Sequence, residues 1–261
     1  MSTSATGATL IEAKGVTKRY GAYVALADVD LLVREGEILS IVGPNGAGKT
    51  TLVNLLTGLF PPTSGSVRFE GNDVARLGPV RLAKDGLARG FQLVHVFAGL
   101  TVAETIAVAA LSRLGRAQRW LATISADRDV EARVERVASI FGLTNKLRTP
   151  ARMLSQGDKK LLDIASAFAL EPRVILLDEP TSGVGSADKH AIMTTLIDAA
   201  KQIGLTSIIL VEHDMDLVAT YSDRIVALQG GRLLADLPRD EFFRNADVVA
   251  AVVGRLPKSV H

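Results

Sequence analysis

The sequence contains no cysteine among its 261 residues. This absence excludes disulfides, zinc–thiolate sites, iron–sulfur clusters and a cysteine nucleophile. No run of about 18 or more apolar residues occurs, so no transmembrane helix is expected. Residues 1–9 are small and polar, with neither a basic start nor an apolar signal core, so we expect no export. The 30 basic and 28 acidic residues leave a net charge of +2, which does not suggest a general nucleic-acid partner.

Hydrophobic residues make up 48% of the chain, too large a share for a disordered protein. The length also suffices to bury a core without disulfide or metal cross-links. We therefore expect a cytoplasmic globular protein.

Strand-like and helix-like segments alternate along much of the chain. Apolar runs at 38–42, 174–177 and 205–211 indicate buried strands, and helical patterns follow at 49–57 and 192–203. A capping box at Thr101 and Glu104 opens a helical middle region. This order favours an α/β fold with a mostly parallel sheet and helices on both faces, in which the helical middle is an insertion.

The strongest local signal is the segment from Gly43 to Thr50, which fits the phosphate-loop pattern G-x-x-x-x-G-K-[ST]. Glycines let the backbone N–H groups curl toward phosphate oxygens, and the following helix adds its positive N-terminal end. Lys49 is suited to the β- and γ-phosphates, and the Thr50 hydroxyl to Mg²⁺. A chance glycine-rich turn is improbable, since a strand precedes the loop and a helix follows it.

Two carboxylates follow the apolar run at 174–177, where ligands bind in parallel sheets. We expect Asp178 to hold Mg²⁺ and Glu179 to polarise the water that attacks the γ-phosphate. The alternative is a pair of acidic residues that begin a surface turn before Pro180. His213 also follows a buried strand, and it could bond the γ-phosphate and align the attacking water. An ordinary strand-end histidine is its alternative.

Taken together, the motifs resemble those of the nucleotide-binding subunit of an ATP-binding cassette (ABC) transporter, from about Leu10 to Gly254. The resemblance implies a P-loop (RecA-like) core with a mostly parallel sheet, an N-terminal antiparallel β subdomain and an inserted helical subdomain. It implies one nucleotide-binding domain over 1–261: residues 9–92 as the β subdomain and Walker A core, 93–165 as the helical subdomain with the signature motif, 166–254 as the rest of the core and 255–261 as a tail.

The same resemblance assigns roles to residues that chemistry alone does not single out. Tyr20 matches the aromatic that stacks on adenine, and Gln92 the glutamine that contacts Mg²⁺ and the membrane partner. Ser155, Gln156 and Gly157 match the signature motif that caps the γ-phosphate on the opposite subunit, although Ser155 could simply cap a helix. The full nucleotide set expected is Tyr20, Gly43, Asn45, Gly46, Gly48, Lys49, Thr50, Thr51, Gln92, Ser155, Gln156 and Gly157. Thr50, Gln92 and Asp178 are the expected metal ligands, and Glu179 and His213 the catalytic residues.

Three positions depart from the commonest form of the family. Gln156 stands where glycine is usual in the signature, and Asp158 where glutamine is usual. Gly185 replaces the usual D-loop aspartate, which removes a side chain that helps to connect the two sites.

Sequence details such as the Gly157–Asp158 pair resemble those of the ATPase subunits that serve importers of branched-chain or other hydrophobic amino acids. That resemblance implies ATP and Mg²⁺, a second ATPase subunit, two transmembrane permease subunits and a substrate-binding protein, with no nucleic acid. It places the chain peripherally on the cytoplasmic face of the cell membrane. Alternatives are the ATPase of a urea or amide importer, the ATPase of a lipid or polysaccharide exporter, and a soluble ABC ATPase acting on ribosomes or DNA.

Overall fold

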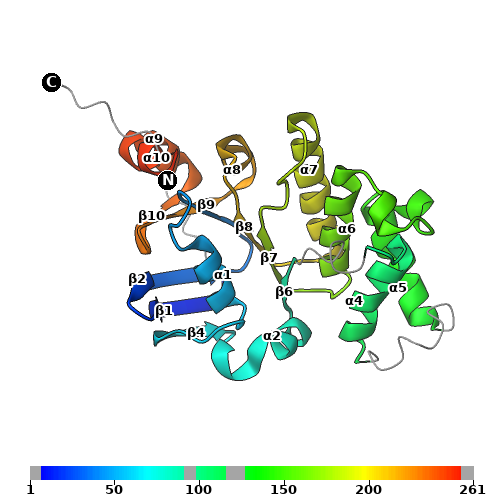
Figure 1. The fold of residues 1–261 in the computed structure, drawn as a ribbon, viewed down its shortest axis with the longest axis horizontal. Coiled ribbons are helices and arrows are strands. Elements are labelled where there is room, and N and C mark those ends of the chain that lie inside the picture. Colours follow the sequence, from blue (N-terminus) through cyan, green and yellow to red (C-terminus); the bar gives the residue numbers. More distant parts are fainter. Residues whose placement is uncertain (1–6, 91–97, 116–126, 254–261) are drawn as a thin grey trace. The chain divides into compact units, whose positions relative to one another are not determined.

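The computed structural model describes residues 7–90, 98–115 and 127–253 (Figure 1). The chain forms two compact units. Unit 1 comprises Met1–Leu82 and Thr206–His261, and unit 2 comprises Ala83–Leu205.

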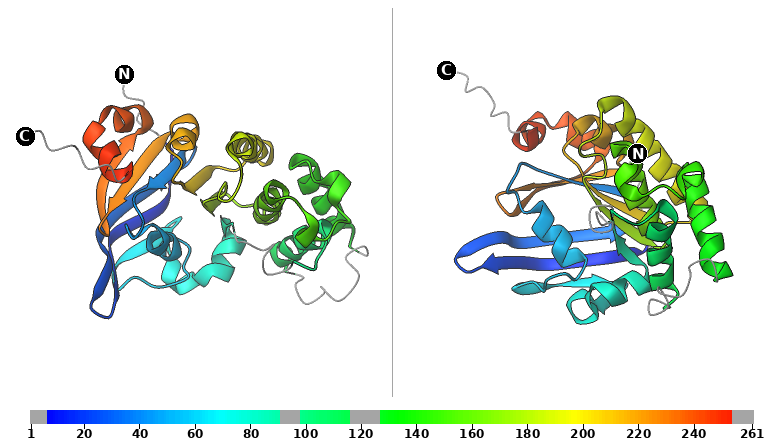
Figure 2. Two further views of the ribbon diagram at one scale, coloured as in Figure 1. Left: turned by 45° about the horizontal axis from the view of Figure 1, so that its top comes forward. Right: turned by 45° about the vertical axis from the view of Figure 1, so that its right-hand side comes forward.

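Unit 1 contains an antiparallel sheet in the order β2-β1-β4-β5. Its strands are β1 (Thr9–Tyr20), β2 (Tyr23–Arg34), β4 (Ser64–Phe69) and β5 (Asn72–Asp73). Figure 2 shows β1 and β2 as long neighbouring strands. A tight turn joins them because Gly21 takes a φ of 60°, which glycine adopts at little cost. Helix α2 (Val74–Asp85) follows β5 and is broken at Gly78, just before Pro79.

The other strands of unit 1 run in the order β10-β9-β3-β8. Strand β3 (Ile38–Val42) pairs in parallel with both β8 (Ser207–Val211) and β9 (Arg224–Gln229), and β10 (Arg232–Pro238) is antiparallel to β9. The helices are α1 (Lys49–Leu56), α8 (Met215–Tyr221), α9 (Arg239–Arg244) and α10 (Ala246–Val253). The last two pack through Phe242 and Val252 on the β9 side of the core.

Unit 2 pairs β6 (Leu87–Arg89) in parallel with β7 (Val174–Asp178). Its helices are α4 (Val102–Arg113), α5 (Arg128–Ile140), α6 (Gln156–Phe168) and α7 (Ser186–Ile203), with short 3₁₀ turns at Thr144–Lys146 and Ala151–Met153. The predicted capping box is present, since Thr101 and Glu104 bond each other's backbone N–H. The predicted α/β class and the helical middle region are therefore confirmed.

A buried ion cluster joins three strands and a turn of unit 1. The Arg224 guanidinium lies 3.1 Å from Glu37 Oε1 and 3.1 Å from Asp236 Oδ1, and it also donates to the Leu32 carbonyl. The Glu37 side chain is 5% exposed. Burial raises the pKa of Asp236, and the charges of Arg224 and Arg34 only partly offset this. The cluster therefore depends on Arg224 to compensate two carboxylates.

We expect Arg224→Met to lower the free energy of unfolding by about 3–5 kcal/mol, because Glu37 and Asp236 lose their common counter-charge. Urea unfolding of the purified chain measures this. Arg232→Met, which removes an exposed arginine from the neighbouring strand, serves as the control and should change stability little. A loss below about 1 kcal/mol for Arg224→Met would show that the cluster is not needed for stability.

Candidate functional site

The predicted phosphate loop connects β3 to α1 in unit 1. Gly43, Gly46 and Gly48 have φ values of 149°, 80° and 102°, a region that side chains with a Cβ rarely adopt. A Cβ on Gly43 would lie 2.3 Å from the Leu228 carbonyl oxygen, and one on Gly48 would lie 2.7 Å from that of Ala25. Both the curl of the loop and its packing therefore require glycine at these two positions.

The N-terminus of α1 differs from those of most other described helices. Its N-cap is Gly48, no side chain caps it, and no acidic residue lies in its first turn. By contrast α4, α5, α6 and α8 each have a side-chain cap and an acidic residue in the first turn. The first N–H groups of α1 and its positive dipole end thus remain suited to an anion, which fits a phosphate group.

Lys49 begins α1 and is only 7% exposed. Its Nζ donates to the carbonyl oxygens of Gly43 at 2.7 Å and Pro44 at 3.1 Å, so the ammonium is held against the loop itself. Thr50, the next residue, is exposed, and Thr51 is half-buried. A fixed positive charge, an exposed hydroxyl and uncapped N–H groups together fit a nucleotide phosphate with its Mg²⁺.

His213 lies near the phosphate loop in unit 1. It follows β8, and it lines a pocket of about 340 Å³ together with Gly43, Pro44, Asn45 and Glu212. Met215 and residues Val252 and Val253 of α10 form the other wall of this pocket, and none of the three was predicted as a site residue. An apolar C-terminal helix carries no motif, so no signal in the sequence pointed to it.

In unit 2, Asp178 ends β7 and Glu179 follows in the turn. Arg89, at the end of the paired strand β6, lies 3.3 Å from Asp178 Oδ2. Glu179 has a φ of 50°, which is uncommon for a residue with a Cβ. Such left-handed residues persist only where surrounding contacts hold them, and they cluster at functional sites. Arg89 was not predicted, because its proximity to Asp178 follows from strand pairing and not from a local motif.

The signature residues lie at the start of α6 in unit 2. Ser155 is the N-cap, and its Oγ accepts from the Asp158 backbone N–H at 3.1 Å, so the predicted helix-capping role is present. Lys146 Nζ reaches Asp158 Oδ2 at 2.6 Å. Burial alone would raise the pKa of Asp158, but hydrogen bonds from Lys146 and Ser155 hold it below its usual value. Asp158 was noted above as a departure from the usual signature, but its partner Lys146 was not predicted.

Two predicted nucleotide contacts remain. Tyr20 ends β1 and is 47% exposed, with the Lys18 ammonium 5.4 Å from its ring centroid, a cation–π distance. Gln92 lies outside the described residues.

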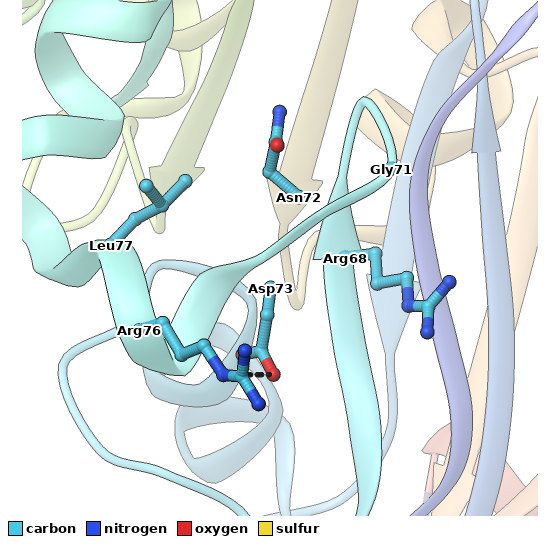
Figure 3. Close-up of a pocket in the computed structure, with 6 residues that line it drawn as sticks. All are labelled: Arg68, Gly71, Asn72, Asp73, Arg76 and Leu77. Carbon is cyan, nitrogen blue, oxygen red and sulfur yellow. Dashed lines mark ion pairs between the residues drawn. The ribbon is translucent and has the colours of Figure 1, made fainter.

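A second pocket of unit 1 lies beside the β4–β5 hairpin and contains none of the predicted site residues (Figure 3). Arg76 pairs with Asp73 at 3.7 Å there, and Arg68 stands opposite. The pair is exposed to solvent and therefore of little energetic weight.

The fold and the loop define a P-loop nucleotide-binding protein of the α/β class. A model of the ABC transporter family matches residues 26–182. The branched-chain amino acid transport ATP-binding protein BraF of Pseudomonas aeruginosa is 32% identical, and LivG of Salmonella typhimurium is 35% identical. Each alignment covers 94% of this chain and 98% of the relative. A solved cassette, MJ1267 in its ADP conformation, is 26% identical with a TM-score of 0.81, over 95% of this chain and 99% of that one.

The chain belongs to the ABC transporter family. It is a nucleotide-binding ATPase of that family, as its motifs predicted. None of the helices in the described ranges combines the length and the apolar character that a membrane span requires.

Proposed function

We propose that this chain is the ATPase subunit that energises an importer of branched-chain or other hydrophobic amino acids. The observation that carries the substrate class is the match to BraF and LivG over nearly their whole lengths. The phosphate loop, with its fixed Lys49 and uncapped α1, supports the ATP chemistry.

We assign the steps of ATP hydrolysis to the motif residues one by one. Lys49 and the loop N–H groups bind the β- and γ-phosphates, and Glu179 accepts the proton of the attacking water. His213 orients that water and the γ-phosphate. Thr50, Asp178 and Gln92 would hold Mg²⁺, and the ion would supply positive charge to offset that of the phosphate oxygens. Mg²⁺ keeps several waters and needs few protein ligands.

The remaining assignments concern the assembly. Tyr20 stacks on adenine, and Ser155, Gln156 and Gly157 cap the nucleotide of a second ATPase subunit. ATP thereby closes a head-to-tail dimer, and hydrolysis opens it again. Two permease subunits in the membrane and a substrate-binding protein complete the importer, with this chain on the cytoplasmic face.

Uptake of labelled leucine, with labelled urea in parallel, tests the proposed substrate class. Cells that carry the native chain are compared with cells that carry Glu179→Gln at equal expression. We expect the variant to lose leucine uptake. Loss of urea uptake alone would move the chain to a urea importer, and no change in either would exclude both substrates. Export and ribosome association would then be the next assays.

A further inference from the structure

One lysine of the signature helix bonds to the turn that carries Glu179, and all of these residues lie in unit 2. Lys160 is five positions beyond Ser155 on α6. Its Nζ donates to Ser182 Oγ at 2.9 Å and lies 3.4 Å from the Glu179 carbonyl oxygen. The same carbonyl accepts the Ser182 backbone N–H at 3.1 Å. Lys160 therefore bonds to both ends of the turn from Glu179 to Ser182.

This turn needs such support because Glu179 adopts a left-handed φ of 50°. The conformation is costly for a residue with a Cβ, and the direction of its carboxylate depends on it. The backbone bond from the Ser182 N–H to the Glu179 carbonyl oxygen restricts that direction in part. A charged ammonium bound to both ends restricts it further, because charge-assisted hydrogen bonds are stronger than neutral ones.

The surroundings of Lys160 indicate a structural connection and not a ligand site. Lys160 lines a pocket of only about 30 Å³, with Asp163 of the same helix and with Leu177, Asp178 and Pro180. That volume is enough for about one or two waters and for no larger ligand. The ammonium is thus held among the end of β7, the turn and its own helix.

We propose that Lys160 is a positioning residue that fixes the Glu179 carboxylate and connects it to the signature helix. The proposal rests on the assignment of Glu179 as the general base. Since Ser155 begins the same helix, a displacement of α6 produced by nucleotide contact at Ser155 reaches Glu179 through this side chain. Lys160 does not touch the reacting atoms, so its loss should affect the rate of the chemical step and not the affinity for ATP.

The test measures kcat and KM for ATP hydrolysis by purified chains. Lys160→Met should lower kcat about tenfold, with KM changed by no more than about twofold. Lys160→Arg, which keeps the charge and the donors, should retain most of kcat. Ser182→Ala should show a smaller loss than Lys160→Met, and the double variant should be no slower than Lys160→Met, because both changes break one interaction. Thermal unfolding checks that each variant is folded.

Lys159→Met is the matched control. It removes the neighbouring lysine of the same helix, which has no side-chain partner within the described residues. Its kcat should equal that of the native chain.

The outcomes separate this inference from the proposed function. If Lys160→Met keeps the native kcat while Glu179→Gln abolishes hydrolysis, or if the losses from Lys160→Met and Ser182→Ala add fully, the inference is overturned and the base assignment stands. If Glu179→Gln itself hydrolyses ATP at the native rate, the base assignment is wrong and the role of Lys160 fails with it.

Discussion

Glu179→Gln is expected to lower the rate of ATP hydrolysis by about 10²- to 10⁴-fold, the range typical for the loss of a general base. The amide keeps the size of the side chain but cannot accept the proton of the attacking water. Binding of ATP should persist, because the phosphate loop is unchanged. The variant should therefore accumulate as an ATP-bound dimer, which size-exclusion chromatography with and without ATP detects.

Glu171→Gln provides a matched control for this experiment. Glu171 is also a glutamate in the left-handed region, with a φ of 49°, and it precedes β7 as Glu179 follows it. Its carboxylate pairs with Arg133 at 3.0 Å and has no proposed part in the chemistry. Glu171→Gln should hydrolyse ATP at the native rate while Glu179→Gln does not. This result would show that the loss in Glu179→Gln comes from removal of the general base and not from replacing a glutamate with a left-handed φ. A Glu179→Gln chain that stays monomeric with ATP and hydrolyses it normally would refute the assignment.

Lys49→Met is expected to lower hydrolysis by about 10²- to 10³-fold, the loss that follows removal of one fixed donor from a developing charge. Nucleotide affinity should also fall, because the phosphates lose their buried cation. The backbone of the loop should persist, since its curl is set by the positive φ values of Gly43 and Gly48. Isothermal titration with ATP measures the affinity, and a coupled phosphate assay measures the rate.

Lys201→Met is the control for that change. Lys201 is a highly exposed lysine near the end of α7, at 3.9 Å from Asp198, so its removal should alter neither affinity nor rate. Thermal unfolding distinguishes a lost phosphate contact from a disrupted loop, because Lys49 also donates to two loop carbonyls. Unchanged ATP affinity in a folded Lys49→Met chain would contradict the proposed role.

The features of the site and of the fold that depend on short stretches of chain could be predicted from the sequence. The left-handed positions of the phosphate loop could be foreseen because only glycine adopts them readily, and Gly43 and Gly48 meet that requirement. The capping box at Thr101 and Glu104 could be foreseen because both partners lie within one helical turn. The order of strands and helices followed from apolar runs, which report burial directly.

Contacts between distant segments were not predictable. The pairing of Arg89 with Asp178 depends on the alignment of β6 with β7, and the Lys146–Asp158 pair on a 3₁₀ turn that carries no motif. The left-handed φ of Glu179 has no signal in the sequence, since glutamate rarely adopts it.

The class of protein and the chemistry of its loop could be read from the sequence, because glycine spacing, a lysine and a buried strand restrict the backbone locally. The contacts that orient the functional side chains, by contrast, are defined only in the folded structure. Lys160 on one helix and Glu179 after a strand are 19 positions apart, and Arg224 meets Glu37 from 187 positions away. Residues so far apart along the chain come into contact only when packing brings their elements together and fixes the direction of each side chain. No local propensity contains that information.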